Sequence, residues 1–112
     1  MRFGERLRAL RLEQRLNQKE VAAAAGIDVT YLSKVENGRL EPPAEGTIRR
    51  LAAALSVEPT ELLLLAHKVP GDLTPIITAS PLVPRFLRAA RNLTDEEWQA
   101  LIEAVEAGRI GP

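Results

Sequence analysis

Cysteine is absent from this 112-residue chain, and histidine occurs once, at His67. Without cysteine there can be no disulfide, no thiolate metal ligand and no cysteine nucleophile, and such a composition suits a reducing compartment. We therefore expect a cytoplasmic protein. A single histidine, with no second histidine or cysteine to pair with it, offers little acid–base or nucleophilic chemistry. The sequence predicts neither an enzyme nor a bound metal or cofactor.

Long hydrophobic runs are also missing, since no apolar segment approaches the ~20 residues that a membrane span needs. The chain begins with an amphipathic pattern at Met1 rather than with a signal peptide, so we expect no membrane association. An excess of either charge is absent as well, because 15 Lys and Arg residues balance 15 Asp and Glu residues. Any nucleic-acid surface must therefore be a local patch rather than a property of the whole chain.

Apolar residues instead recur at helical spacing, and 46% of the residues are hydrophobic. The first stripe, Phe3, Leu7 and Leu10, lies among charged residues and predicts an amphipathic helix. No segment reads as a convincing strand, so the predicted fold class is all-α. Five helices are expected before Val69, at about 2–15, 18–24 and 29–37, then one after Pro43 and one from Pro59 to His67.

Residues with capping preferences mark several of these helix ends. Asn17, followed three residues later by Glu20, predicts a capping box for the second helix, and Asp28 predicts a cap for the third. Gly26 supplies the turn between them, and Gly38 can take the left-handed conformation that ends the third helix. Two short helices joined by a tight turn containing glycine are the signature of a helix-turn-helix unit.

A change of organisation is predicted at Lys68-Val69-Pro70-Gly71, because Pro and Gly together break helical continuity. We expect a bundle over residues 1–69 and a helical extension over residues 70–112. The extension is predicted to hold three helices, at 73–78, at 82–92, and after a capping box formed by Thr94 and Glu97.

An apolar stripe runs along the last two of these helices and has no partner within the predicted five-helix bundle. A face of this kind needs another surface to cover it. The residues that we expect to form a dimer or partner surface are Phe86, Trp98, Leu101, Ile102 and Val105.

The third predicted helix has an outward face that is unusual for a surface helix. If Leu32 and Val35 face the core, helical geometry turns the following residues outward: Val29, Thr30, Ser33, Lys34 and Asn37. Methyl, hydroxyl and ammonium groups suit the DNA major groove, where thymine offers a methyl group and guanine two acceptors. The same residues also fit the first turns of an ordinary helix, and this segment alone does not decide between the two interpretations.

Several motifs occur together in one order: Leu-Arg-x-x-Arg, Asn-Gln-x-x-Val-Ala, Ala-Gly-Ile, Tyr-Leu-Ser-Lys-Val-Glu-Asn-Gly and Pro-Pro. In that order and spacing, the chain from Phe3 to about His67 resembles the Xre/Cro–C1 family of phage-repressor-like helix-turn-helix regulators. The resemblance covers roughly the first three-fifths of the chain.

The resemblance implies a five-helix bundle whose third helix enters the major groove, with base contacts from Val29, Thr30 and Lys34. Tyr31 either reaches the phosphate backbone or packs beside the second helix. The residues expected to contact DNA phosphates are Asn17, Gln18, Ser33, Asn37 and Arg39.

Arg11 and Glu36 match a pair that the family uses as an internal salt bridge between the first and third helices. We expect this pair to be structural rather than to contact DNA. Two positions depart from the family pattern. Ala44 stands where a Ser or Thr usually caps the fourth helix, and Ser56 stands where a Gly often ends it.

Together these features predict a sequence-specific DNA-binding transcriptional regulator, a repressor that binds a palindromic operator in double-stranded DNA as a homodimer. Dimerisation through the extension is favoured over folding back on the bundle, because two recognition helices about 34 Å apart gain both affinity and specificity. The alternative is an antitoxin-like or adaptor protein whose C-terminal helices bind a protein partner, with DNA binding secondary. The sequence does not exclude that alternative.

Overall fold

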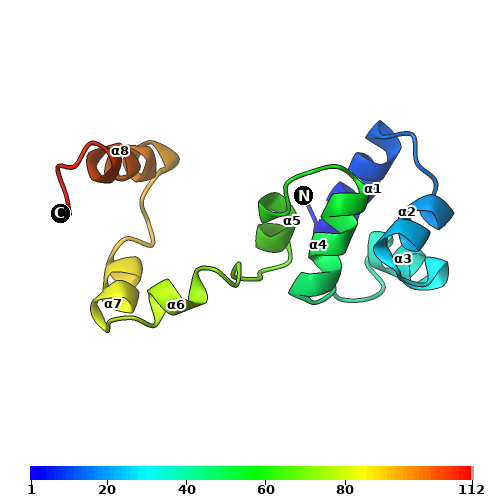
Figure 1. Ribbon diagram of the computed structural model, residues 1–112, viewed down its shortest axis with the longest axis horizontal. Helices are drawn as coiled ribbons and strands as arrows, with labels where there is room; N and C mark the ends of the chain where they lie inside the picture. The colour runs from blue at the N-terminus through cyan, green and yellow to red at the C-terminus, as the bar shows by residue number, and fades with distance from the viewer. Residues whose placement is uncertain (112) are drawn as a thin grey trace. The chain divides into compact units, whose positions relative to one another are not determined.

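The computed structural model describes residues 1–111, which form eight helices and no strand (Figure 1). The predicted all-α class is confirmed. None of these eight helices is long and apolar enough to cross a membrane. The helices are α1 (Phe3–Glu13), α2 (Gln18–Ala25), α3 (Val29–Glu36), α4 (Glu45–Ala54), α5 (Thr60–Leu65), α6 (Thr74–Ile77), α7 (Leu82–Ala89) and α8 (Asp95–Glu106).

The chain divides after Gly71 into two compact units, the first spanning Met1–Gly71 and the second beginning at Asp72. The end of the first unit is attached to α4, because the N–H of Gly71 donates to the Glu45 carboxylate at 3.2 Å. Arg49 donates to the same carboxylate at 2.8 Å. These hydrogen bonds, that of Arg49 first, lower the pKa of Glu45 below its ordinary value.

One hydrophobic core holds the first unit together, and all five of its helices contribute to it. Complete burial of one large apolar side chain contributes roughly 1.5–3 kcal/mol. α2 joins the core through Val21 and through the small Ala22 and Ala25, which let neighbouring helices approach closely. The large side chains that are most completely buried are Leu7, Val21, Leu32, Ile48, Leu51, Leu55, Leu62 and Leu63.

Each helix of the first unit is followed by a residue with positive φ. Gly26 and Gly38 have the expected left-handed conformation, but Arg15, Ser56 and His67 adopt it too, each with φ 56°. The next residue then donates its N–H to a carbonyl of the last helical turn, which closes the helix. The residue types of Arg15 and His67 do not mark a helix end. The prediction from the sequence therefore ended α1 at 15 and α5 at 67, whereas the helices end two residues earlier, at Glu13 and Leu65.

The second unit contains helices but almost no core of its own. Among its residues up to 111, only Ala90 is buried. The predicted capping box is present at the start of α8, where Glu97 N–H donates to the Thr94 hydroxyl at 3.2 Å and Thr94 N–H donates to the Glu97 carboxylate at 3.0 Å. The Phe86 and Trp98 rings pack edge to face with centroids 6.3 Å apart.

At Gly4 the backbone of α1 lies directly against the end of α3. A Cβ atom there would lie 2.7 Å from the Glu36 carbonyl oxygen and closer still to that of Val35. Because both oxygens belong to the backbone, α3 would have to shift, and we predict that Gly4→Ala lowers the free energy of unfolding by about 1–3 kcal/mol. Urea denaturation measures this change.

The matched control is Gly46→Ala in the first turn of α4. A Cβ atom there meets only the Arg50 guanidinium, at 3.9 Å. Since alanine is the better helix former, this variant should be as stable as the wild type or more stable by about 0.5–1 kcal/mol. Equal stability of the Gly4→Ala and Gly46→Ala variants would contradict the close approach at Gly4.

Candidate nucleic-acid interface

α2 and α3 pack against each other and are joined by a three-residue turn. Gly26 begins this turn with φ 70° and ψ 35°, a left-handed conformation that glycine adopts without strain. The Asp28 carboxylate then accepts the N–H of Thr30 at 2.7 Å and so begins α3. From α4, Arg50 donates to the Ala25 carbonyl at 2.9 Å and satisfies the end of α2. Both sides of the turn are therefore fixed by local hydrogen bonds.

α3 has a polar outer face opposite a buried one. Leu32 and Val35 are buried, whereas Thr30 and Lys34 are exposed. Val29 is only half-exposed and packs against the core. It precedes Leu32 by three residues and so lies on nearly the same side of the helix. This corrects the expectation of a fully outward Val29, whose side chain is shared between the core and the surface.

The residues expected to contact phosphates lie at the start of α2 and along or just after α3. Asn37 and Arg39 are exposed, and Ser33 is half-buried. The predicted capping box of α2 is present, since the Asn17 side-chain oxygen accepts the Glu20 N–H at 2.8 Å and Asn17 N–H donates to the Glu20 carboxylate at 3.1 Å. The oxygen of Asn17 is committed to the helix, so any further contact falls to its NH₂ group.

Two basic side chains on or just after α3, Lys34 and Arg39, are exposed. Within residues 1–111 neither takes part in an ion pair, whereas Arg6, Arg11 and Arg49 are paired with carboxylates. Their ammonium and guanidinium groups can therefore donate charge-assisted hydrogen bonds to an external anion or base acceptor.

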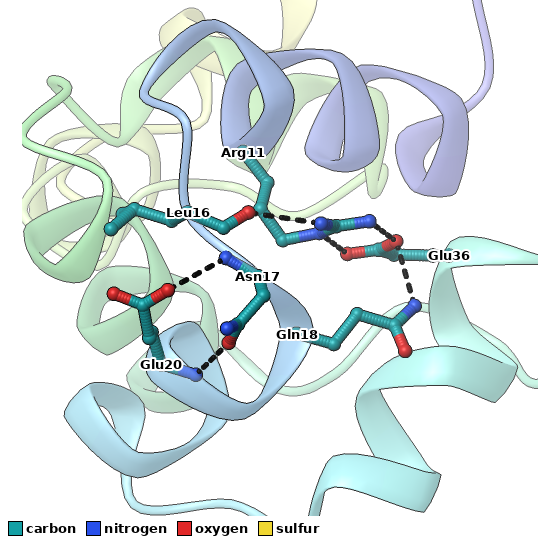
Figure 2. A network of polar contacts seen from close by, with 6 residues as sticks. All are labelled: Arg11, Leu16, Asn17, Gln18, Glu20 and Glu36. Atoms are coloured by element: carbon teal, nitrogen blue, oxygen red, sulfur yellow. Dashed lines mark hydrogen bonds and ion pairs between the residues drawn. The ribbon is translucent and has the colours of Figure 1, made fainter.

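Arg11 and Glu36 form a bidentate ion pair in the interior of the first unit (Figure 2). Arg11 Nε lies 2.8 Å from Glu36 Oε2, and Nη2 lies 2.9 Å from Oε1. The two side chains are only 9% and 1% exposed, respectively. Arg11 Nη1 also donates to the Leu16 carbonyl at 3.0 Å. The hydrogen bonds to Glu36 raise the pKa of Arg11 above its ordinary value although burial opposes this, so the guanidinium stays charged.

Gln18, expected only as a phosphate contact, belongs to the same network. Its Nε2 donates to Glu36 Oε1 at 3.1 Å, as Figure 2 shows. No sequence signal marks this contact, because it depends on how α2 packs against α3. The network satisfies the buried charges: within residues 1–111, every buried side-chain nitrogen or oxygen atom has a hydrogen-bond partner.

The predicted dimer or partner surface forms an apolar groove of about 520 Å³ on the second unit. Phe86, Ile102 and Val105 are about half exposed, at 51%, 48% and 56%. Trp98 and Leu101 are partly buried. Two residues that the sequence did not assign to this surface, Glu106 and Ile110, also line the groove.

Comparison with known proteins places residues 2–65 in a family described as a helix-turn-helix domain. The chain is 33% identical over 106 residues to the HTH-type transcriptional repressor RghR of Bacillus subtilis. This alignment covers 88% of this chain and 78% of that protein. It is 44% identical over 63 residues to the HTH-type transcriptional regulator DdrOP3 of Deinococcus deserti, covering 56% of this chain and 48% of that protein. It is 37% identical over 57 residues to the ImmF control region 10 kDa protein of Bacillus phage phi105, covering 51% of this chain and 62% of that protein. The chain thus spans most of the first relative's length but less than two thirds of the other two.

The turn at Gly26 brings α3 against α2 with the polar side of α3 outward, and this arrangement defines a helix-turn-helix DNA-binding unit. The chain belongs to the helix-turn-helix family of transcriptional regulators, of the Xre/Cro–C1 type whose motifs it carries. Proteins of this family bind DNA and are not enzymes, so the resemblance seen in the sequence and the expectation of a non-enzymatic regulator are both confirmed.

The buried ion pair generates a prediction about stability. Removing one member leaves the other charge buried without compensation, so Arg11→Met and Glu36→Leu should each lower the free energy of unfolding by about 3–5 kcal/mol. The double variant should lose less than either single variant. Urea unfolding of the four proteins measures the coupling.

Arg49→Met is the control for this cycle. Its ion pair with Glu45 is exposed to solvent, so its loss should change the free energy of unfolding by less than about 1 kcal/mol. Additive losses in the Arg11→Met, Glu36→Leu double variant would rule out coupling between the two buried charges.

Proposed function

We propose that the protein is a sequence-specific repressor that binds a palindromic operator as a homodimer, with α3 of each copy in the major groove. The observation that carries the proposal is the outer face of α3, where an exposed hydroxyl and an exposed ammonium stand on a helix anchored by Leu32 and Val35. Repression is supported by the name of the Bacillus subtilis relative, a transcriptional repressor similar over 88% of this chain.

Base readout is assigned to Thr30, Lys34 and the exposed part of Val29. In the major groove the Lys34 ammonium can donate to guanine O6 and N7, and the Thr30 hydroxyl can donate or accept. A methyl group of Val29 can contact a thymine methyl group. Because Val29 also packs against the core, its position is fixed more firmly than that of an exposed side chain, which favours discrimination between bases.

Phosphate binding is assigned to the start of α2 and to the segment on and after α3. The first N–H groups of α2 have no intrahelical acceptor, and the helix dipole places partial positive charge there. A phosphate bound at this end would accept from the backbone and from side-chain amides. The side chains proposed to contact phosphates are Asn17, Gln18, Ser33, Asn37 and Arg39.

Dimerisation is assigned to the apolar groove of the second unit. Residues 72–111 include one buried residue, Ala90, and leave Phe86, Ile102 and Val105 about half exposed, so this part of the chain cannot cover its own apolar surface. A second copy suits this surface because the unit carries both signs of charge. Arg85 and Arg88 lie on α7, whereas five acidic residues lie on α8: Asp95, Glu96, Glu97, Glu103 and Glu106.

No ion pair joins these charges within residues 72–111 of one chain. A two-fold arrangement can set the basic helix of each copy beside the acidic helix of the other, so that charge pairs surround an apolar centre. If the protein does not dimerise in the test below, the result supports the alternative function. In that case the protein is antitoxin-like or an adaptor, and another protein occupies the groove.

Footprinting on DNA upstream of the protein's own gene tests the proposal directly. We expect protection of a sequence with two-fold symmetry whose half-sites lie about one helical turn apart on one DNA face. Mobility shifts with and without the product of the neighbouring gene separate a repressor from an adaptor. Protection that appears only with that product would overturn the assignment as an independent DNA-binding repressor.

The assignments on and after α3 predict two different losses of DNA binding. Lys34→Ala should cost about 1–3 kcal/mol of operator affinity and relax the base preference at one position of each half-site. Arg39→Ala should weaken binding to all sequences alike and reduce the slope of log K against log salt by about one unit. Fluorescence anisotropy with wild-type and single-base operator variants measures both.

Arg8→Ala serves as the control for the loss of a positive charge. Arg8 is an exposed residue of α1 and is not among the proposed contacts, so operator affinity should stay close to wild type. If Lys34→Ala and Arg39→Ala also bind like the wild type, the proposed placement of α3 is wrong.

Dimerisation through the second unit is tested by removing that unit. The hydrophobic core of the first unit lies wholly within residues 1–71, so the truncated chain should stay folded by circular dichroism. It should sediment as a monomer and bind the operator far more weakly than the full chain. Trp98→Asp in the full chain should have the same effect, because it puts a charge in the lining of the apolar groove.

Gln99→Asp adds the same charge at the adjacent, exposed position of α8 and should leave the dimer intact. A truncated chain that remains dimeric would contradict the assignment. So would a full-length protein that is monomeric at micromolar concentration, and the groove would then be assigned to a different protein partner.

A further inference from the structure

The ion pair of Arg11 and Glu36 extends to the surface through Gln18. Glu36 Oε1 accepts from two donors, Arg11 Nη2 at 2.9 Å and Gln18 Nε2 at 3.1 Å. We infer that Glu36 is a positioning residue for DNA binding, which orients the Gln18 amide toward a phosphate, and that Arg11 neutralises the carboxylate so that it can do so. This inference rests on the proposed function.

The chemistry of Glu36 decides which way the Gln18 amide turns. A side-chain amide has an NH₂ group that donates and a carbonyl oxygen that accepts, and the two are interchangeable by rotation. An ionised carboxylate only accepts, so the Gln18 amide must direct its NH₂ group toward Glu36. One N–H of that group is used, and the second N–H remains for another acceptor. A phosphate oxygen is also only an acceptor, so the orientation set by Glu36 presents the group that a phosphate needs.

The charge of Glu36 makes Arg11 necessary for this arrangement. A carboxylate without a counter-ion, one side chain away from a bound phosphate, would repel it in a poorly hydrated environment. The bidentate contact of Arg11 cancels that charge inside the protein, and both side chains are at least nine-tenths buried. The surface near Gln18 therefore offers a donor without a net negative charge behind it.

Arg11 also fixes the chain where it enters α2. Its Nη1 atom donates to the Leu16 carbonyl at 3.0 Å, one residue before the cap Asn17 (Figure 2). The same guanidinium thus holds the backbone before the helix start and, through Glu36, the first side chain of the helix. Both parts of the proposed phosphate site, the first N–H groups of α2 and the Gln18 amide, depend on one buried group.

A double-mutant cycle on operator affinity tests the inference. Gln18→Ala in the wild-type chain should weaken operator binding about tenfold, because it removes a hydrogen bond to a charged group. In the Arg11→Met, Glu36→Leu background, where nothing orients the amide, the same change should weaken binding less than about threefold. Since the amide is uncharged, Gln18→Ala should leave the salt slope unchanged, unlike Arg39→Ala.

Gln14→Ala is the matched control, since Gln14 is an exposed glutamine four residues earlier, at the end of α1. It should bind the operator like the wild type. Equal fold losses for Gln18→Ala in the two backgrounds would overturn the inference, and so would an undiminished affinity of Gln18→Ala in the wild-type chain.

If the double background does not fold, NMR of the wild-type chain provides the same test. One side-chain N–H proton of Gln18 should shift far more than the other when operator is added, because only one of the two protons gains a new acceptor. Equal shifts of the two protons would overturn the inference. Failure of this inference is distinguishable from failure of the proposed function. If the proposed function is wrong, the wild-type chain gives no footprint or Lys34→Ala leaves the base preference unchanged.

Discussion

The buried pair of Arg11 and Glu36 is the interaction on which the arrangement of the first three helices depends. Removing charges from water costs several kcal/mol per ion, so a buried pair persists only when its remaining hydrogen-bonding groups are also satisfied. Here all three guanidinium nitrogen atoms of Arg11 donate hydrogen bonds, and both carboxylate oxygen atoms of Glu36 accept them. These bonds reach the end of α1, the start of α2 and the end of α3. Directional contacts therefore set the positions of the two helix ends that we assign to DNA, with apolar packing supporting them.

The two units differ in how they satisfy the need to bury apolar surface. The first unit buries apolar side chains from all five of its helices in one core, and the charged side chains of Arg11 and Glu36, buried beside it, are paired with each other. The second unit has well-formed helices, a capping box and an aromatic pair, yet its apolar groove is open. Local hydrogen bonds define where these helices begin and end, but most of the stability of a short helix comes from packing of its apolar face. The open groove is the feature behind our proposal that the second unit binds a protein surface, while the first unit carries the helix-turn-helix.

Particular residues show where sequence-based prediction was accurate. Asn17 with Glu20 and Thr94 with Glu97 were predicted as capping boxes, and both are present, because this motif depends on residues three positions apart in one helix. Arg15 and His67 show where it was not. They adopt a left-handed conformation that their residue types do not favour, and the next residue in each case donates its N–H back to the last turn of the helix.

The sequence by itself determined the helical class, the glycine turn at Gly26 and the residues that lie on α3, because these depend on periodicity and on neighbours along the chain. Tertiary structure alone decided that Val29 is shared between core and surface, and that Gln18 reaches the carboxylate of Glu36. The physical reason is the distance along the chain over which each interaction acts. Capping and amphipathicity act over three or four residues, whereas a hydrogen bond across 18 residues exists only after α2 and α3 have packed together.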